Sequence, residues 1–374
     1  MRHIIFGGDI GNHALKAVFG ENNRLYMINT VREVGETKSR PIIGEDEKVI
    51  DTLDIIIRCP HYEALNNRRF WVGNNALGMD EYQTSVKTKK TENDLILVPL
   101  LASIALQANH SREEFIAEGI IGLPMLEYIG GNEGEGESEK EKFRKKITGE
   151  YEIEFVTTAS LKGWKVKFKL IPHIKPESLL VILRQMIGQD GKLIHPDWKG
   201  QSMGSIDIGG FSTDVGIIDE NHKPDGNLCR GFQFGSATAL DEISKAIAKK
   251  YDYQFPRHMI EKFINKDNCQ MRIGAKVISI KEIVEANFRA TSNQISQGII
   301  ELMKNPKASQ VARFFVFGGG TVDYKKYLIN NLSSKIMSEL IWLTDNPDET
   351  VYYNAYAFYF MMKAMRARMT KISG

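Results

Sequence analysis

The sequence has few cysteines and no long apolar run, and both shortages exclude classes of protein. Only Cys59, Cys229 and Cys269 occur among its 374 residues. Their wide spacing offers neither a disulfide framework nor a zinc-binding pattern, which is typical of a reducing cytoplasm. No apolar stretch approaches the roughly 18 residues of a membrane-spanning helix. The chain opens on a strand-like segment without a charged leader, so we expect no signal peptide and a cytoplasmic protein.

The chain also lacks a strong net charge and the best-known phosphate-binding motifs. Its formal net charge is +2, so there is no electrostatic case for direct binding to nucleic acid or to an anionic membrane. Neither the P-loop nor the GxGxxG dinucleotide fingerprint occurs. The most apolar segment, residues 351–362, is apolar on all sides in its front half, which predicts a buried helix rather than one lying on a membrane.

Strand-like and helix-like segments alternate along the chain, which predicts an α/β protein. The first strands are expected at Arg2–Phe6, Ala14–Phe19 and Leu25–Ile28. The pattern restarts at residue 202, with strands expected at Ser202–Ile208, Thr213–Asp219 and Asn227–Phe234. This repetition suggests internal duplication of a βββα-type unit.

The remaining segments complete this plan. Residues 32–90 are irregular and polar and suggest an insertion or small subdomain, with strand-like pieces at 53–58 and 70–72. Helices are expected over 92–109, 237–251, 256–265 and 279–303, and further strands over 116–123, 151–155, 164–171 and 313–317. The acidic glycine-rich stretch 130–137 predicts an exposed loop. The alternating charges of residues 140–146 favour a solvated helix face, with a polymer contact as the alternative.

One short turn near the N-terminus has the composition of a phosphate-binding loop. Residues 8–12 read Gly-Asp-Ile-Gly-Asn, and Lys16 follows on the returning strand. Glycine lets backbone N–H groups approach a phosphate, and the carboxylate of Asp9 suits Mg²⁺ through the waters that this ion retains. Lys16 could place its ammonium near a phosphate. An ordinary hairpin also uses aspartate and glycine, so this turn alone is not specific.

A second turn and a triple glycine make the case stronger. Residues 207–214, Asp-Ile-Gly-Gly-Phe-Ser-Thr-Asp, hold more glycines, hydroxyls and carboxylates than a plain hairpin needs. Residues 318–320 are three glycines after an apolar strand, which predicts either a tight βα turn or a close backbone approach to a nucleoside. Two such turns about half a chain apart suggest two related halves that close on one phosphate–metal group.

Hydrolysis also needs a group that orients or deprotonates water. Glu177 is the candidate, because Pro176 is expected to start a helix there and to place the carboxylate at the positive end of the helix dipole. The alternative is a carboxylate that only caps the helix.

At these residues the sequence resembles the actin superfamily of ATPases, which includes actins, heat-shock chaperone ATPase domains and sugar kinases. The resemblance rests on Asp9-x-Gly11 with Lys16, on Asp207-x-Gly209-Gly210 with Thr213, and on residues 316–320 (Val-Phe-Gly-Gly-Gly). Shorter matches make the chain similar to the ParM-type bacterial actins that segregate plasmids. They are residues 122–124 (Gly-Leu-Pro) with Tyr128, residues 143–147, residues 176–178 (Pro-Glu-Ser), and residues 278–280 leading into Glu285.

The resemblance implies an actin-like fold, in which two related domains of duplicated RNase H-like βββαβα units surround a central nucleotide cleft. Domain I would comprise residues 1–190 and 343–374, with a small subdomain at about 33–90. Domain II would comprise residues 191–342.

The resemblance also implies roles for single residues. Asp9 and Asp207 would hold Mg²⁺ through water, and Glu177 would position the attacking water. The residues expected to bind nucleotide are Gly11, Asn12, Lys16, Gly209, Gly210, Ser212, Gly235, Ser236, Glu285, Gly318, Gly319 and Gly320. Among them, Gly235 and Ser236 match a ribose contact, Glu285 an adenine contact, and the triple glycine the nucleoside lining. The implied cofactors are ATP and Mg²⁺, with GTP as an alternative.

The function implied is a polymerising ATPase whose cytoskeletal filaments segregate plasmid DNA. Its partners would be further copies of itself and a DNA-binding adaptor protein, without direct contact to nucleic acid or membrane. A small-molecule kinase and a non-polymerising nucleotide-gated binding domain are the alternatives on the same fold. We find no second constellation of residues for a sugar or carboxylate acceptor.

Overall fold

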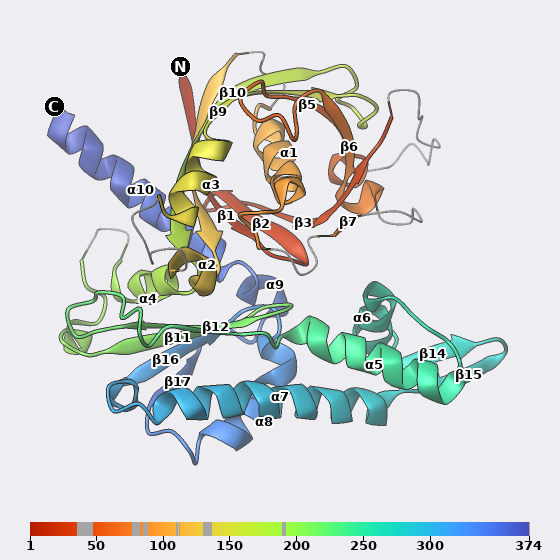
Figure 1. Ribbon diagram of the computed structural model, residues 1–374, viewed down its shortest axis with the longest axis vertical. Coiled ribbons are helices and arrows are strands. Elements are labelled where there is room, and N and C mark those ends of the chain that lie inside the picture. Colours follow the sequence, from red (N-terminus) through yellow and green to blue (C-terminus); the bar gives the residue numbers. More distant parts are fainter. Residues whose placement is uncertain are drawn as a thin grey trace. The chain divides into compact units, whose positions relative to one another are not determined.

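The chain is described here by a computed structural model, which covers residues 1–35, 48–76, 83–84, 89–109, 111, 113–129, 137–188 and 192–373. The loop expected at 130–137 lies outside these residues except for Glu137. The structure divides into two units (Figure 1): one comprises Met1–Ile194 and Tyr352–Gly374, and the other comprises His195–Val351. The second boundary follows helix α9 (Pro347–Thr350), whereas the division expected from the sequence, between residues 342 and 343, precedes it.

The first unit contains most of the strands. They are β1 (Arg2–Ile10), β2 (Ala14–Gly20), β3 (Asn23–Ile28), β4 (Thr30–Glu33), β5 (Asp54–Arg58), β6 (Arg68–Val72), β7 (Gln83–Thr84), β8 (Phe115–Leu123), β9 (Gly149–Phe155) and β10 (Lys165–Pro176). Its helices are η1 (Val49–Asp51), η2 (Gly73–Asn75), η3 (Asp94–Leu97), α1 (Val98–Leu106), α2 (Met125–Ile129), α3 (Glu139–Ile147), α4 (Leu179–Met186) and α10 (Tyr353–Ser373).

The strands of the first unit form one curled sheet around α1. Their order is β3-β2-β1-β8-β10-β9-β5-β6-β4-β7. Residues 98–105 of α1 are all buried, and the helix lies inside the curl of the sheet (Figure 1), where it contacts β2, β4, β6, β9 and β10. A helix that is apolar on every side needs such an enclosed position. Strands β5 and β6 are therefore integral to this sheet, although the sequence pattern suggested only strand-like pieces of an insertion there.

Helix α10 returns the C-terminal segment to the first unit. It contacts β1, β2, β8 and α4, and Ala355, Phe358 and Met362 are buried in this contact. The prediction of a buried helix from the apolar pattern of residues 351–362 is confirmed. No helix within the described residues is long and apolar enough to span a membrane.

The second unit is smaller and has helices beside a five-stranded sheet. Its strands are β11 (Met203–Ile208), β12 (Thr213–Ile218), β13 (Arg230–Phe232), β14 (Gln270–Ile273), β15 (Lys276–Ser279), β16 (Arg313–Phe317) and β17 (Glu339–Trp342). Its helices are η4 (Pro196–Trp198), α5 (Ser236–Tyr251), α6 (Arg257–Asn265), α7 (Lys281–Met303), η5 (Ala308–Gln310), α8 (Thr321–Leu332) and α9 (Pro347–Thr350). Helix α7 packs between α5 and α8 (Figure 1), and β14 and β15 form a separate two-stranded sheet.

The two units share one arrangement of five strands, which confirms the duplicated α/β fold class expected from the sequence. The sheet order is β13-β12-β11-β16-β17 in the second unit, and β3-β2-β1-β8-β10 is the matching part of the first. In both, the first three strands are antiparallel neighbours and the last two run parallel to the first. The carboxyl ends of the three parallel strands therefore meet at one edge of each sheet, where ligands of α/β proteins commonly bind.

Some expected elements differ from the observed ones. The strand expected over 227–234 shortens to β13, and the helix expected over 92–109 begins as the 3-10 helix η3. The structure also contains β14, β15 and β17, which the pattern did not predict. Each of these strands is four residues long, too short to show a clear period of two.

Candidate functional site

In the first unit, the turn between β1 and β2 is held by hydrogen bonds at both of its ends. Gly11 N–H donates to the carbonyl of Ala14 at 3.0 Å, and the Asn29 side chain donates to the Gly11 carbonyl at 3.0 Å. A Cβ atom at Gly11 would lie 2.9 Å from the backbone carbonyl oxygen of Ala14, so the turn favours glycine there. Asp9 and Lys16 are opposite each other across the strands, with 3.7 Å between carboxylate and ammonium. Four of the predicted residues, Asp9, Gly11, Asn12 and Lys16, therefore lie in or beside one small turn.

Glu177 lies at the same edge of the first sheet, and Lys90 holds its carboxylate. Both side chains are buried, and Lys90 Nζ lies 2.5 Å from Glu177 Oε1. Burial by itself would lower the pKa of Lys90, but the negative charges of Glu177, then Asp9 and Glu127, outweigh this effect and raise that pKa. Lys90 thus stays charged beside two of the residues predicted to be catalytic.

The helix expected to begin at Pro176 begins later, so the prediction that Glu177 lies at a helix N-terminus is wrong. Pro176 is the last residue of β10 and is opposite Leu123 of β8. Glu177 N–H extends this pairing by donating to the Leu123 carbonyl at 2.8 Å. The chain then turns at Ser178, whose φ is +68°, and α4 starts at Leu179. Proline has the φ of both a strand end and a helix start, and here the pairing with β8 determines its place.

In the second unit, the turn between β11 and β12 repeats the first turn. Gly209 N–H donates to the Ser212 carbonyl at 2.9 Å, as Gly11 does to Ala14. Asp207 is opposite Asp214, at the positions where the first turn has Asp9 and Lys16. The Ser212 hydroxyl donates to the Asp214 carboxylate at 3.0 Å, which leaves its oxygen able to accept. The second turn therefore carries two carboxylates where the first carries an ion pair.

The first residues of helix α5 form hydrogen bonds to the turn between β11 and β12. Ser236 N–H donates to the Gly209 carbonyl at 3.0 Å, and Ala237 N–H to the Gly210 carbonyl at 2.6 Å. A Cβ atom at Gly235 would lie 2.5 Å from both of these carbonyl oxygens. The predicted ribose residues Gly235 and Ser236 are thus in direct contact with the predicted phosphate turn.

The triple glycine packs directly against Asp207. Gly318 has φ +102°, and a Cβ atom there would lie 2.4 Å from Asp207 Oδ1, so both its backbone conformation and its surroundings require glycine. Gly320 N–H donates to the Ile208 carbonyl at 2.9 Å. Helix α8 begins immediately afterwards at Thr321. The structure thus brings the second turn, Gly235, Ser236 and Gly318–Gly320 together within one unit.

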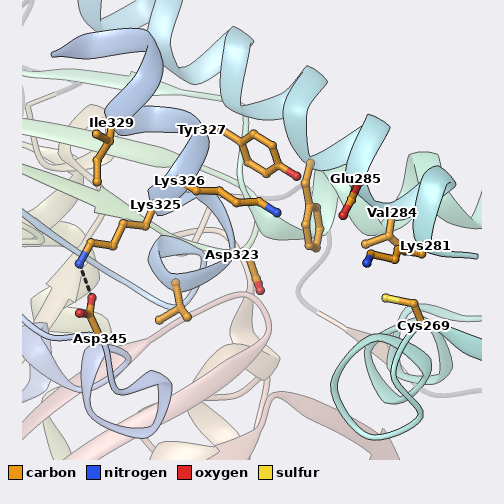
Figure 2. A pocket seen from close by; sticks show the side chains of 12 residues that line it. Cys269, Lys281, Val284, Glu285, Asp323, Lys325, Lys326, Tyr327, Ile329 and Asp345 are labelled. Carbon is orange, nitrogen blue, oxygen red and sulfur yellow. Dashed lines mark hydrogen bonds and ion pairs between the residues drawn. The ribbon is translucent and has the colours of Figure 1, made fainter.

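Beyond the triple glycine, α7 and α8 border an open cavity of about 660 Å³ (Figure 2). This volume lies in the range of ligand pockets, roughly 300–1,000 Å³. Its lining combines apolar and charged side chains: Cys269, Lys281, Val284, Glu285, Phe288, Val322, Asp323, Lys325, Lys326, Tyr327, Ile329 and Asp345. The predicted adenine contact, Glu285, belongs to this wall. Flat apolar walls with a few polar groups suit a nucleobase.

The donor groups fit a magnesium ion that keeps most of its waters. Within the described parts of the chain, no three histidine, cysteine, aspartate or glutamate residues gather closely enough to form a metal cage. Mg²⁺ commonly binds through one or two carboxylates, water and substrate phosphates. Asp9 and Asp207 each provide a carboxylate of this kind, at the end of the first strand of their units.

Comparison with known proteins agrees with this geometry. The family model for the C-terminal part of the archaeal MreB-like actin homologue matches residues 205–329. Among solved structures, Bacillus thuringiensis ParM with AMPPNP has a TM-score of 0.71 and 18% identity, over 98% of this chain and 100% of that chain. The chain has an actin-like fold. Its second unit matches the actin homologue across the second turn, the triple glycine and most of the cavity.

Two further solved structures show the same actin-like fold. The archaeal actin homologue Ta0583 has a TM-score of 0.71 and 16% identity, over 97% of this chain and 99% of that chain. A Bacillus thuringiensis ParM hybrid protein with ADP, which contains two ParM mutants, has a TM-score of 0.72 and 18% identity. That comparison covers 98% of this chain and 49% of the hybrid. No curated protein matches the chain.

Sequence reasoning missed two side chains of this actin-like protein. Lys90 precedes a threonine–glutamate pair in a polar segment without periodicity, so nothing in the sequence marks it as a partner of Glu177. Asp323 is separated from the triple glycine by only two residues, and that proximity was the one available signal for it.

Proposed function

We propose that this chain is an actin-like ATPase that polymerises with bound nucleotide into cytoskeletal filaments. We further propose that these filaments segregate DNA such as plasmids, through an adaptor protein that binds the DNA. The observation that carries the proposal is the buried Lys90–Glu177 pair, which lies at the same sheet edge as the Asp9 turn in a chain with an actin-like fold. The net charge of +2 favours an adaptor over direct DNA binding.

The nucleotide would be bound by groups from both glycine turns. In the first unit, the N–H groups near Gly11 and Asn12 and the ammonium of Lys16 suit phosphate oxygens. In the second unit, Gly209, Gly210 and the Ser212 oxygen suit them as well. A bound Mg²⁺ would neutralise phosphate charge, with Asp9 and Asp207 holding its waters. The α7–α8 cavity would take the nucleobase.

The chemistry assigned to the chain itself is the orientation of water by Glu177. A carboxyl group can take up a proton from an attacking water only while it is ionised, and the adjacent Lys90 ammonium favours that state. Lys90 also fixes the position of the carboxylate. Glu177 is therefore suited to align a water molecule for attack and to accept its proton.

Phosphate release and light scattering test this proposal together. Glu177→Gln keeps the size of the side chain and removes its charge, so hydrolysis should fall about 100-fold or more, while polymerisation with ATP and Mg²⁺ persists. Filaments of the variant should then last longer than those of the unchanged protein. Glu220→Gln, at an exposed turn position, is the matched control and should leave both rates unchanged. Equal turnover in Glu177→Gln would remove Glu177 from this role.

A further inference from the structure

Asp323 is a half-buried carboxyl group in the wall of the α7–α8 cavity. It lies in the first turn of α8, and Figure 2 shows it directed into the space between α8 and α7, with Glu285 on the opposite side. Within the described residues, its carboxyl has no hydrogen-bond donor or ion-pair partner. A partly buried carboxylate in a cavity wall can accept a hydrogen bond from a ligand that displaces its water.

The charged groups around Asp323 do not neutralise it. Burial, and then the negative charge of Glu261 on α6, raises the pKa of Asp323 to about 6. On its own helix, Lys325 is 2.5 Å from Asp345, and Lys326 lies 4.7 Å above the ring of Tyr327. A hydrogen-bond donor on a ligand in the cavity would therefore complement this carboxyl.

We propose that Asp323 selects the nucleobase by accepting a hydrogen bond from the exocyclic amino group of adenine; this inference rests on the proposed nucleotide-binding function. Val284, Phe288 and Tyr327 provide apolar surface for the faces of a purine ring, which leaves its polar edge for the carboxyl. Guanine and hypoxanthine carry a carbonyl oxygen at the position of that amino group. Two acceptors would then face each other without a proton between them, so ATP is favoured over GTP.

Calorimetric titration with ADP, IDP and GDP in the presence of Mg²⁺ at pH 7.5 tests this selection. The diphosphates avoid turnover during the measurement. The unchanged chain should bind ADP about tenfold or more tightly than IDP, since one donor contact to a charged group is lost. In Asp323→Asn, the amide can donate to the carbonyl oxygen, so the preference should disappear or reverse. In Asp323→Ala, ADP binding should weaken about tenfold and the preference should fall below about threefold.

Two comparison variants make the result specific. Asp348→Asn makes the same charge change at an exposed position outside the cavity and should preserve the preference for ADP. Glu285→Gln changes the carboxyl on the opposite wall. If that variant, rather than Asp323→Asn, removes the preference, the assignment to Asp323 is overturned.

Failure of this inference can be separated from failure of the proposed function. If the unchanged chain binds none of the three nucleotides, both are wrong. If it binds them equally, or if Asp323→Asn keeps the original ratio of ADP to IDP affinity, nucleotide binding stands and the role of Asp323 falls.

Alkylation of Cys269 provides a second readout that needs no substitution. Cys269 lines the cavity, whereas Cys59 and Cys229 are buried. Burial raises the pKa of the Cys59 thiol to about 11, so that thiol should react slowly. Saturating ADP should slow the reaction of Cys269 with N-ethylmaleimide severalfold, and IDP at the same concentration should slow it less. An unchanged rate with ADP bound would place the base elsewhere and overturn the proposal.

Discussion

Lys90 and Glu177 form the most consequential side-chain pair in the first unit. Both groups are withdrawn from water, with 6% and 8% of their side-chain surfaces exposed. A buried ion pair of this kind adds little net stability, whereas loss of one partner leaves the other charge without compensation. The pair is therefore better explained by the position and charge it gives to Glu177 than by stability.

Replacement of Lys90 tests this view. Lys90→Met should lower the free energy of unfolding by about 3–5 kcal/mol, because Glu177 is left buried and unpaired. The double variant Lys90→Met/Glu177→Gln should recover much of that loss while remaining inactive in ATP hydrolysis. Denaturant unfolding and phosphate release measure the two effects. The exposed pair Lys142–Glu139 is the control, and Lys142→Met should cost less than about 1 kcal/mol. If Lys90→Met lowered the free energy of unfolding by as little as Lys142→Met, the buried ion pair would not have the role described here.

The carboxyl of Asp323 should make stability depend on pH. Because burial and then Glu261 raise its pKa from 3.8 to about 6, the folded protein binds more protons than the unfolded chain between these values. Its contribution to stability is therefore lost as pH rises through this window. Asp323→Asn lacks this titration. The free energy of unfolding of the variant, relative to that of the unchanged chain, should therefore rise by about 2 kcal/mol from pH 4.5 to pH 7.5. Denaturant unfolding at both pH values would show it, and a difference that is constant with pH would contradict it.

The pairing of β10 with β8 and the packing of α10 together place Glu177. Ser178, directly after it, is fully buried with φ +68°, and its N–H donates to the side chain of Asn354 on α10 at 3.0 Å. A segment held in this unfavourable region of backbone space depends on such contacts. The element that returns from the C-terminal end thus fixes the geometry of the residue predicted to orient water.

Asn354→Ala should loosen this segment. The buried Ser178 N–H would lose its partner, at a cost of about 1–3 kcal/mol, and turnover should fall while the dissociation constant for nucleotide changes little. Asn23→Ala, which removes an exposed side-chain bond to Gln107, should change neither quantity. Stopped-flow phosphate release with equilibrium titration separates the two parameters. Weakened nucleotide binding with normal turnover would refute the positioning role.

Much of the fold could be predicted from the sequence, because alternating strands and the two glycine turns are local patterns. The turns at Gly11 and Gly209 each close with a hydrogen bond to a residue three positions later, and strand β16 was predicted with the bounds that the structure has. The partnership of Lys90 with Glu177 was not predictable, because it joins residues 87 positions apart in the sequence. The start of α4 was missed because proline fits a strand end as well as a helix start.

The two units of the chain share the same order of five strands. The repetition extends to the turns, where Asp9 and Asp207 occupy matching positions opposite Lys16 and Asp214. Duplication alone would give two equal turns, yet one carries an ion pair and the other two carboxylates. The two turns therefore differ in the chemistry that they offer: the ammonium of Lys16 in the first suits an anion, and the two carboxylates of the second suit a hydrated cation.

Electron microscopy with different nucleotides tests the central claim most directly. Negatively stained samples with ATP and Mg²⁺ should contain filaments, and parallel samples with ADP should contain few, because hydrolysis is proposed to end the assembled state. The comparison should span a range of protein and salt concentrations, since assembly depends on both. Absence of filaments under all of these conditions, or equal filaments with ATP and ADP, would contradict the proposal that this actin-like chain is a nucleotide-dependent polymerising ATPase.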